Sequence, residues 1–231
     1  MFKRYWLGCA ALLVASSAFA ELSRDEVKRF TESAAILTEL RATPDKGIPE
    51  EMWSHAECAI VIPSMKKAAF IVGGEYGSGV MACRTASGWS APVFMQLAKG
   101  TWGLQIGAEQ VDLVLLVMNR RGVNKLLEDK VSLGADASVA AGPVGRTATA
   151  ATDAQLHAEM LSYSRSQGVF AGIDLSGGVL HPDKDADGRA YGKGITARQV
   201  IDGTGGVTAP LAAEPFLTSL RHQVGTTQSK R

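Results

Sequence analysis

Ser64 and Lys67 have the spacing of the S-x-x-K motif, in which a serine hydroxyl is the nucleophile of exported penicillin-binding enzymes. That chemistry needs a serine that opens a helix, so that the lysine lies one turn further on beside the hydroxyl. Residues 68–72 instead read Ala-Ala-Phe-Ile-Val, which is typical of a strand. The companion motifs are missing, because residues 99–101 are Lys-Gly-Thr and no S-D-N occurs. We therefore expect a turn between two strands, not a nucleophile.

Asp183, Asp185 and Asp187, followed by Gly188, resemble the opening of a calcium-binding loop. The glutamate that closes such a loop should stand at position 194, which is glycine in this chain. A weak ion site is therefore the alternative, and a solvated turn inside a polar loop over residues 181–188 is the expectation.

The remaining chemical signals are weaker. The glycine-rich residues 73–79 have the wrong order for G-x-G-x-x-G and precede a strand, so they indicate no nucleotide site. None of the four histidines has the spacing of a motif such as H-E-x-x-H. We expect no cofactor, no metal and no enzymatic activity. A hydrolase with an unrecognised site is the alternative, because catalytic triads are assembled in space.

Residues 1–20 have the features of a secretory signal peptide. Lys3 and Arg4 precede an apolar run at residues 7–14, and Ala18-Phe19-Ala20 has the A-x-A form of a cleavage site. We expect cleavage after Ala20 and a periplasmic or secreted protein.

Two cysteines, Cys58 and Cys83, remain after that cleavage, and an even pair in an exported protein predicts a disulfide. Two buried free thiols are the alternative.

The composition limits the class of protein. Hydrophobic residues make up 46% of the 231 residues, and 25 glycines favour tight turns and strands, which argues against disorder, coiled coil and collagen. Loss of Lys3 and Arg4 from the 24 basic residues leaves 22, against 23 acidic residues. The molecule as a whole is therefore not expected to bind nucleic acid.

The elements that would position these residues follow from caps and periodicity. Ser23 and Glu26 form a capping box, and apolar residues at helical spacing continue a helix to Pro44. Pro49 predicts the start of a short second helix. Residues 120–129, 196–201 and 210–222 also have helical patterns. Short β-branched or aromatic stretches predict strands at residues 59–62 (ended by Pro63), 68–73, 79–85, 91–97, 102–109, 111–118, 156–164 and 169–175.

These elements predict an α+β fold, a single domain of many short, mainly antiparallel strands with a few flanking helices. The sheet is expected to be sandwich- or barrel-like. We divide the chain into a signal peptide (1–20), an N-terminal amphipathic helix (21–45) and a domain over residues 46–231.

Several stretches are similar to the SYLF family, in its exported bacterial branch. They are residues 58–70, 77–80, 88–92, 103–107, 112–116, 133–146, 163–172, 191–192 and 210–221. The resemblance implies phospholipid binding without catalytic residues. Eukaryotic relatives bind phosphoinositides at membranes, and some fungal relatives bind actin, so the property expected in a bacterial envelope is recognition of anionic lipid. Eukaryotic relatives place a basic amphipathic segment before the domain, whereas the first helix here mixes acidic and basic residues, which favours packing against the sheet.

A lipid headgroup needs cations, and an acyl chain needs apolar surface. The candidates are Lys66, Lys67, Arg84, Arg146, Arg165, Tyr163 and Phe170. A solvated surface is the alternative for the cations, and an ordinary core for the aromatic residues. Arg146 and Arg165 are the preferred cations, because they stand beside small residues at expected strand ends. The rival hypothesis pairs each arginine with a buried acid such as Asp136 or Glu159.

The sequence thus predicts an exported, non-enzymatic protein that binds anionic phospholipid at the cell envelope. A structural protein of the envelope that binds a protein partner is the main alternative.

Overall fold

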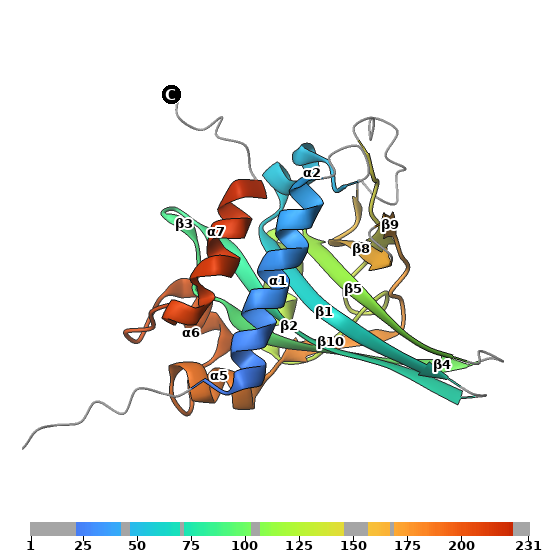
Figure 1. The fold of residues 1–231 in the computed structure, drawn as a ribbon. Coiled ribbons are helices and arrows are strands. Elements are labelled where there is room, and N and C mark those ends of the chain that lie inside the picture. Colours follow the sequence, from blue (N-terminus) through green and yellow to red (C-terminus); the bar gives the residue numbers. More distant parts are fainter. Residues whose placement is uncertain are drawn as a thin grey trace, which may run out of the picture.

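The computed structural model describes residues 22–42, 47–69, 72–102, 107–145, 157–166 and 169–223, and these residues form a ten-stranded sheet with flanking helices (Figure 1). The strands are β1 (Cys58–Ala69), β2 (Val72–Thr85), β3 (Gly88–Trp89), β4 (Val93–Trp102), β5 (Gly107–Val117), β6 (Val131–Ser132), β7 (Val139–Ala141), β8 (Met160–Ser166), β9 (Val169–Gly172) and β10 (Gly178–Pro182). Their order is β6-β10-β4-β2-β1-β5-β8-β7, with β3 beside β2 and β9 beside β8. Within the described part of the chain, all pairs of these named strands are antiparallel except β7 with β8. The predicted α+β class is confirmed.

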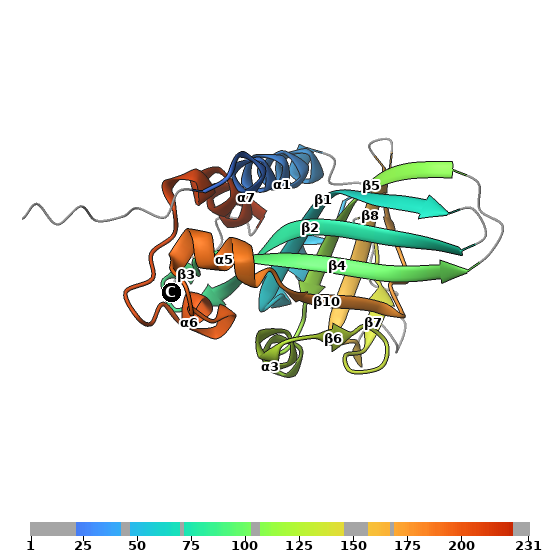
Figure 2. The ribbon, with the colours of Figure 1, turned by 90° about the horizontal axis from the view of Figure 1, so that it is seen from below.

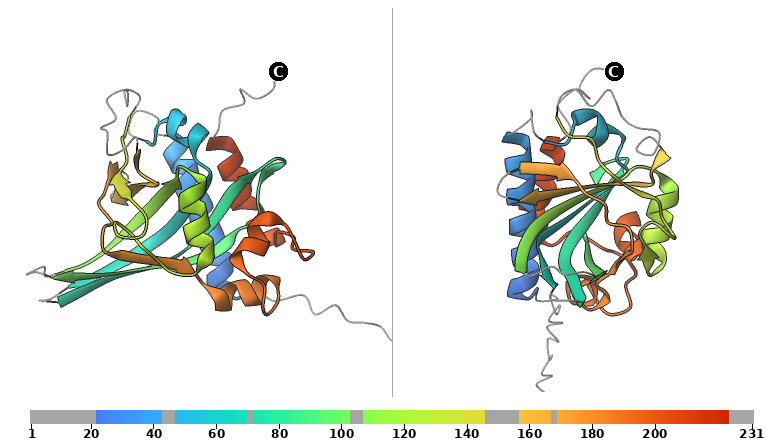
Figure 3. Two further views of the ribbon diagram at one scale, coloured as in Figure 1. Left: turned by 180° about the vertical axis from the view of Figure 1, so that it is seen from behind. Right: turned by 90° about the vertical axis from the view of Figure 1, so that its right-hand side faces the viewer.

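The sheet curls into a half-barrel whose two faces are covered by different helices (Figure 3). The helices are α1 (Arg24–Ala42), α2 (Glu50–His55), α3 (Arg120–Glu128), α5 (Lys184–Tyr191), α6 (Ala197–Asp202) and α7 (Glu214–Gln223), with a 3₁₀ turn η2 (Leu211–Ala213). We call the face packed against α1, α2 and α7 the outer face, and the face packed against α3 and α6 the inner face. Among the described residues, no helix has both the length and the apolar character needed to cross a bilayer.

The central strands are buried on both faces. In β1, Ile60 and Ile62 belong to the inner core, whereas Ala59 and Val61 belong to the outer core, and all four are fully buried. A strand with two buried faces reads as a continuous apolar run, which explains why residues 59–62 carry no alternation.

The helix ends follow the sequence signals. The Ser23 N–H donates to Glu26 Oε2 at 2.6 Å and the Glu26 N–H donates to Ser23 Oγ, so the predicted capping box exists. The side chain of Asn119 caps α3, and Thr196 with Gln199 forms a second capping box at α6. The helices predicted near residues 49, 120, 196 and 210 are confirmed.

The prediction that Pro63 ends a strand was wrong. β1 continues to Ala69 through a β-bulge, where the register shifts between Ile62 and Met65. Ser64 has a positive φ of 49° at the bulge, and its N–H donates to Asp112 Oδ1 at 2.9 Å. A bulge accommodates proline because one position of the ladder is already unpaired. Ser64 and Lys67 therefore lie within one strand, and the expected turn between two strands does not exist there.

The polar loop expected over residues 181–188 was also wrong. β10 runs to Pro182 and α5 begins at Lys184, with Asp183 as its N-cap. Asp187 is buried and its Oδ1 accepts a hydrogen bond from the Phe94 N–H, whereas Asp185 is exposed. The three aspartates thus face different surroundings instead of lining one turn.

Cys58 and Cys83 form the predicted disulfide. They are direct partners in the pairing of β1 with β2. No separate strand over residues 68–73 lies between them, since those residues belong to the ends of β1 and β2 and to the two residues between, which lie outside the described part.

Candidate functional site

One end of the sheet extends beyond the helices. β1, β2, β4 and β5 project past α1, α5, α6 and α7, as Figure 2 shows. On the outer face of this projecting end, Lys66 of β1 is paired with Tyr76 of β2. Lys66 is exposed and Tyr76 is 50% exposed. On the neighbouring strands, Gln110 is the partner of Lys66 and Ala98 is the partner of Tyr76. Towards the end of the sheet lie Gly74 and Gly100, and a Cβ at Gly100 would meet nothing within 4 Å, so the surface on that side of the pair is open. We call Lys66, Tyr76, Gly74 and Gly100 the sheet-end surface.

Arg165 lies on the same face, but its guanidinium is already paired with acidic side chains. Its Nε and Nη2 both contact Asp112 Oδ2 at 2.9 Å, and its Nη1 contacts Glu39 of α1. Burial raises the pKa of the Asp112 carboxyl, while the hydrogen bond from the Ser64 N–H opposes this rise. Arg165 therefore joins β8 to β5 and α1. Its partners differ from those that the rival hypothesis named, because Asp136 accepts from Ser132 and Glu159 from Lys125.

Replacing Arg165 with glutamine should lower stability by about 1–2 kcal/mol, because the largely buried Asp112 carboxylate would lose its cation. The Arg165 and Asp112 side chains are only 19% and 15% exposed. Urea unfolding measures the change. Arg221→Gln is the control, since Arg221 pairs with Glu214 at the surface and should change stability by less than about 0.5 kcal/mol. Equal effects of the two substitutions would contradict the assignment.

Tyr163 and Phe170 are core residues of the outer face. Phe170 is the partner of Arg165 in the pairing of β8 with β9. The Tyr163 ring packs against Gly142 so closely that a Cβ there would lie 2.0 Å from Cζ. The Tyr163 hydroxyl is buried without a hydrogen-bond partner among the described residues, and burial raises its pKa. The structure thus places Tyr163, Arg165 and Phe170 on the same face of the sheet, with the two aromatic residues buried and Arg165 half-buried.

Arg84 lies at the opposite end of β2. It is eight residues from Tyr76 along the strand, which corresponds to about 26 Å. Its Nε donates to the Ala56 carbonyl and its Nη2 to the Trp53 carbonyl, and its guanidinium stacks over Trp89 at 4.7 Å. Arg84 and Lys66 therefore cannot contact one headgroup. Arg146 and the side chain of Lys67 lie outside the described part of the chain.

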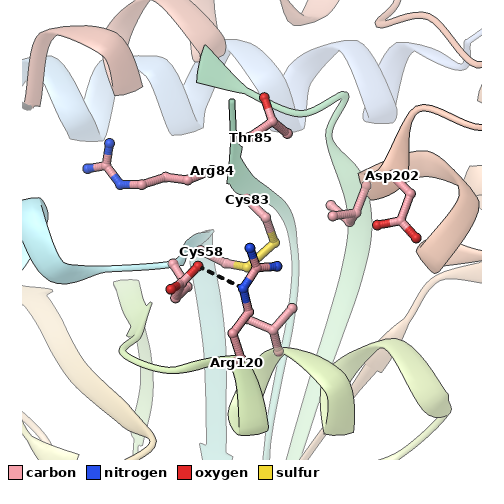
Figure 4. Close-up of a pocket in the computed structure, with 9 residues that line it drawn as sticks. Cys58, Cys83, Arg84, Thr85, Arg120 and Asp202 are labelled. Carbon is pink, nitrogen blue, oxygen red and sulfur yellow. Dashed lines mark ion pairs between the residues drawn. A yellow bond between two sulfur atoms is a disulfide. The ribbon is translucent and has the colours of Figure 1, made fainter. Parts of the chain in front are cut away.

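A pocket of about 250 Å³ beside the disulfide was missed by the sequence analysis (Figure 4). Its lining residues are Glu57, Cys58, Cys83, Arg84, Thr85, Arg120, Val123, Ile201 and Asp202. They come from segments up to 145 residues apart. The predicted disulfide was therefore the sequence signal that could have pointed to this pocket.

A charged cluster under the start of α1 was also missed. Arg29 Nη1 contacts Asp183 Oδ2 at 2.8 Å, and Arg189 contacts the buried Glu26 at 2.6 Å. Burial, together with the nearby Asp183 and Glu26 carboxylates, raises the pKa of the neighbouring Asp187 to about 7, although the hydrogen bond from the Phe94 N–H and the Arg29 charge oppose the rise. The cluster joins α1 to α5.

Residues 98–223 match the family model of Ysc84, described as a Las17-binding protein actin regulator. This match covers more than half of the chain. The chain belongs to the Ysc84 family, also called SYLF. An SH3 domain-containing protein of Schizosaccharomyces pombe is 35% identical over 181 residues, which are 77% of this chain and 41% of that protein. Protein YSC84 of Saccharomyces cerevisiae is 33% identical over 180 residues, 76% of this chain and 38% of the relative.

The human relative, SH3 domain-containing YSC84-like protein 1, is 32% identical over 184 residues, which are 78% of this chain and 54% of that protein. The chain thus spans between about two fifths and just over half of the length of these Ysc84-family relatives.

Proposed function

We propose that this Ysc84-family protein binds anionic phospholipid at a membrane surface, and that the sheet-end surface makes the contact. The observation that carries the proposal is the exposed pair of Lys66 and Tyr76 at the end of the sheet that the helices leave uncovered (Figure 2). The resemblance to lipid-binding SYLF proteins points to the same class of ligand.

Charge and shape favour a bilayer as the occupant. A lysine near an anionic bilayer contributes about 1 kcal/mol, and tyrosine is enriched at the membrane interface because its ring is apolar and its hydroxyl is polar. Gly74 and Gly100 leave the surface between the strands without side chains, so headgroups can approach the backbone closely. Lys67 and Arg146 remain proposed additional cations.

Export and cleavage after Ala20 are part of this proposal. The Cys58–Cys83 disulfide supports it, because such bonds persist mainly in oxidising compartments. Fractionation of cells and mass measurement of the mature protein would test it. An intact chain that begins at Met1 and lies in the cytosol would contradict export.

Flotation with liposomes tests the lipid contact. The protein should float with vesicles that contain phosphatidylglycerol and much less with phosphatidylcholine alone. Lys66→Glu should weaken binding roughly 30-fold, since one charge is lost and an opposite charge is added, at about 1 kcal/mol each. Adding Tyr76→Ala to this substitution should weaken vesicle binding further.

Lys193→Glu is the matched control, because Lys193 is an exposed lysine between α5 and α6, at the helical end of the molecule. An equal loss of vesicle binding in the Lys66 and Lys193 variants would show that the total charge of the protein, not the sheet-end surface, controls binding. No preference for anionic vesicles in the unmodified protein would overturn the proposal. Capture of one stoichiometric protein partner would then favour the alternative of an interaction protein.

A further inference from the structure

The pocket beside the disulfide is separate from the sheet-end surface. Four segments build it, with Glu57 before β1, Thr85 at the end of β2, Arg120 at the start of α3 and Asp202 at the end of α6. Its volume of about 250 Å³ has room for about eight water molecules, or for a ligand of about eight non-hydrogen atoms. It can therefore be assigned a ligand independently of the proposed membrane contact.

Charges of both signs face this space. Figure 4 shows the Arg120 side chain extending toward the disulfide and Asp202 on the α6 side of the same space. Glu57 Oε2 lies 3.4 Å from Arg120 Nε. The Arg84 side chain points away from the disulfide in the same view and donates to the backbone carbonyls of Ala56 and Trp53. One guanidinium and two carboxylates therefore remain for a ligand.

Apolar groups line part of the pocket, together with the Thr85 side chain. Val123 and Ile201 accompany the disulfide of Cys58 and Cys83. Such a surface suits a short alkyl segment, because a methylene buried there loses contact with water. A ligand with this shape needs one anionic end, one cationic end and a short apolar middle.

We propose that the pocket binds a small zwitterion of the aminoalkyl phosphate class. The phosphate contacts the Arg120 guanidinium, whose planar donors match phosphate oxygens in pairs. The ammonium faces the Asp202 carboxylate, and the methylenes lie on the disulfide, Val123 and Ile201. O-phosphoethanolamine has eight non-hydrogen atoms and is the simplest probe.

Binding requires little disruption of the protein. The Arg120 side chain is 77% exposed and that of Glu57 is 33% exposed, and an ion pair so exposed contributes little to stability. The pair can therefore open and re-form around a ligand that supplies both charges. An anion without an ammonium would be repelled by the two carboxylates, and a cation without a phosphate would be repelled by Arg120.

Titration calorimetry with O-phosphoethanolamine tests the assignment. Arg120→Gln and Asp202→Asn should each weaken binding at least tenfold, as expected for the loss of one charge-assisted contact. Arg121→Gln is the matched control, because Arg121 is 78% exposed on the next position of α3 and pairs with Glu159. Inorganic phosphate alone and ethanolamine alone should bind at least tenfold more weakly than the zwitterion.

A second readout uses the disulfide itself. A ligand that lies on Cys58 and Cys83 should slow reduction of the native protein by dithiothreitol, and the Arg120→Gln variant should lose this protection.

Vesicles that contain phosphatidylethanolamine identify the source of the headgroup: displacement of the free probe indicates a lipid, and no displacement indicates a soluble metabolite. Either result supports the site.

Absence of saturable binding to the unmodified protein would overturn this proposal. Equal affinity of the Arg120, Asp202 and Arg121 variants would also overturn it. The sheet-end proposal would stand in both cases, because Lys66 and Tyr76 take no part in the pocket.

Discussion

Alanine at position 79 should strongly destabilise the sheet. A Cβ on Gly79 would lie 2.0 Å from the Val61 carbonyl oxygen and 2.8 Å from the Ile62 Cα, and both atoms belong to the backbone of β1. The bulge that follows Ile62 leaves β1 close to β2 at this point, so relief would require the two central strands to separate. We expect a loss of more than about 3 kcal/mol, beyond the usual cost of overpacking and a large part of a typical total stability.

Two other glycines of β2 provide a graded comparison. A Cβ on Gly77 would meet the side chains of Ile62 and Met65, which can move, whereas one on Gly74 would meet only the Lys99 carbonyl oxygen at 3.9 Å. Stability should therefore fall in the order Gly74→Ala, Gly77→Ala, Gly79→Ala, with Gly74→Ala within about 1 kcal/mol of the unmodified protein. Circular dichroism and urea unfolding measure the series. A Gly79 variant as stable as the Gly74 variant would refute the close approach.

Asparagine at position 187 should stabilise the protein at alkaline pH. Asp187 is 2% exposed, and burial raises its pKa from 3.8 to about 7. The folded state therefore binds the proton more tightly than the unfolded state. The stability that this proton contributes is complete below about pH 4 and is lost as the pH rises through about 7. The loss amounts to about 4 kcal/mol for a shift of this size.

Asparagine has the shape of the protonated acid, and its side-chain oxygen can still accept the hydrogen bond from the Phe94 N–H. The charged groups around position 187 are Asp183, Glu26 and Arg29, with Arg189 bound to Glu26. These groups are present in both proteins, so the difference between variant and parent isolates Asp187. This difference should be largest near pH 8 and small near pH 4.

Asp185→Asn is the control for Asp187→Asn, since Asp185 occupies the same helix but is exposed. Thermal unfolding at several pH values gives the comparison. A gain that does not depend on pH, or a gain of equal size at position 185, would show that Asp187 does not hold a proton in the folded state.

The helices could be predicted because their signals are local. Ser23 and Glu26 satisfy each other's backbone groups within one turn, and Thr196 does the same with Gln199. The pairing of Cys58 with Cys83 also followed from a short count, since two cysteines remain in residues 21–231.

The errors arose where distant residues override a local signal. Pro63 resembles the end of a strand, but Asp112, 48 residues away from Ser64, holds the bulge that lets β1 continue. The segment that contains Asp183 and Asp187 resembles a solvated loop in sequence. In the structure, Arg29 of α1 pairs with Asp183 and the Phe94 N–H of β4 donates to Asp187, so both carboxylates are held in the interior at α5. The pocket could not be predicted for the same reason. Spacing along the chain does not show which helix ends lie together beside a disulfide.

The first helix of the described chain depends on the last one. Gln223 of α7 donates a hydrogen bond to the Leu37 carbonyl of α1 across 186 residues, and Thr38 lies beside Ser219. At about 5–20 residues per second, ribosomes need about 10–40 s to make the chain between them. During this interval α1 has been synthesised but lacks the helix that covers it. A cellular factor that acts only on unfolded chains therefore has that time in which to bind.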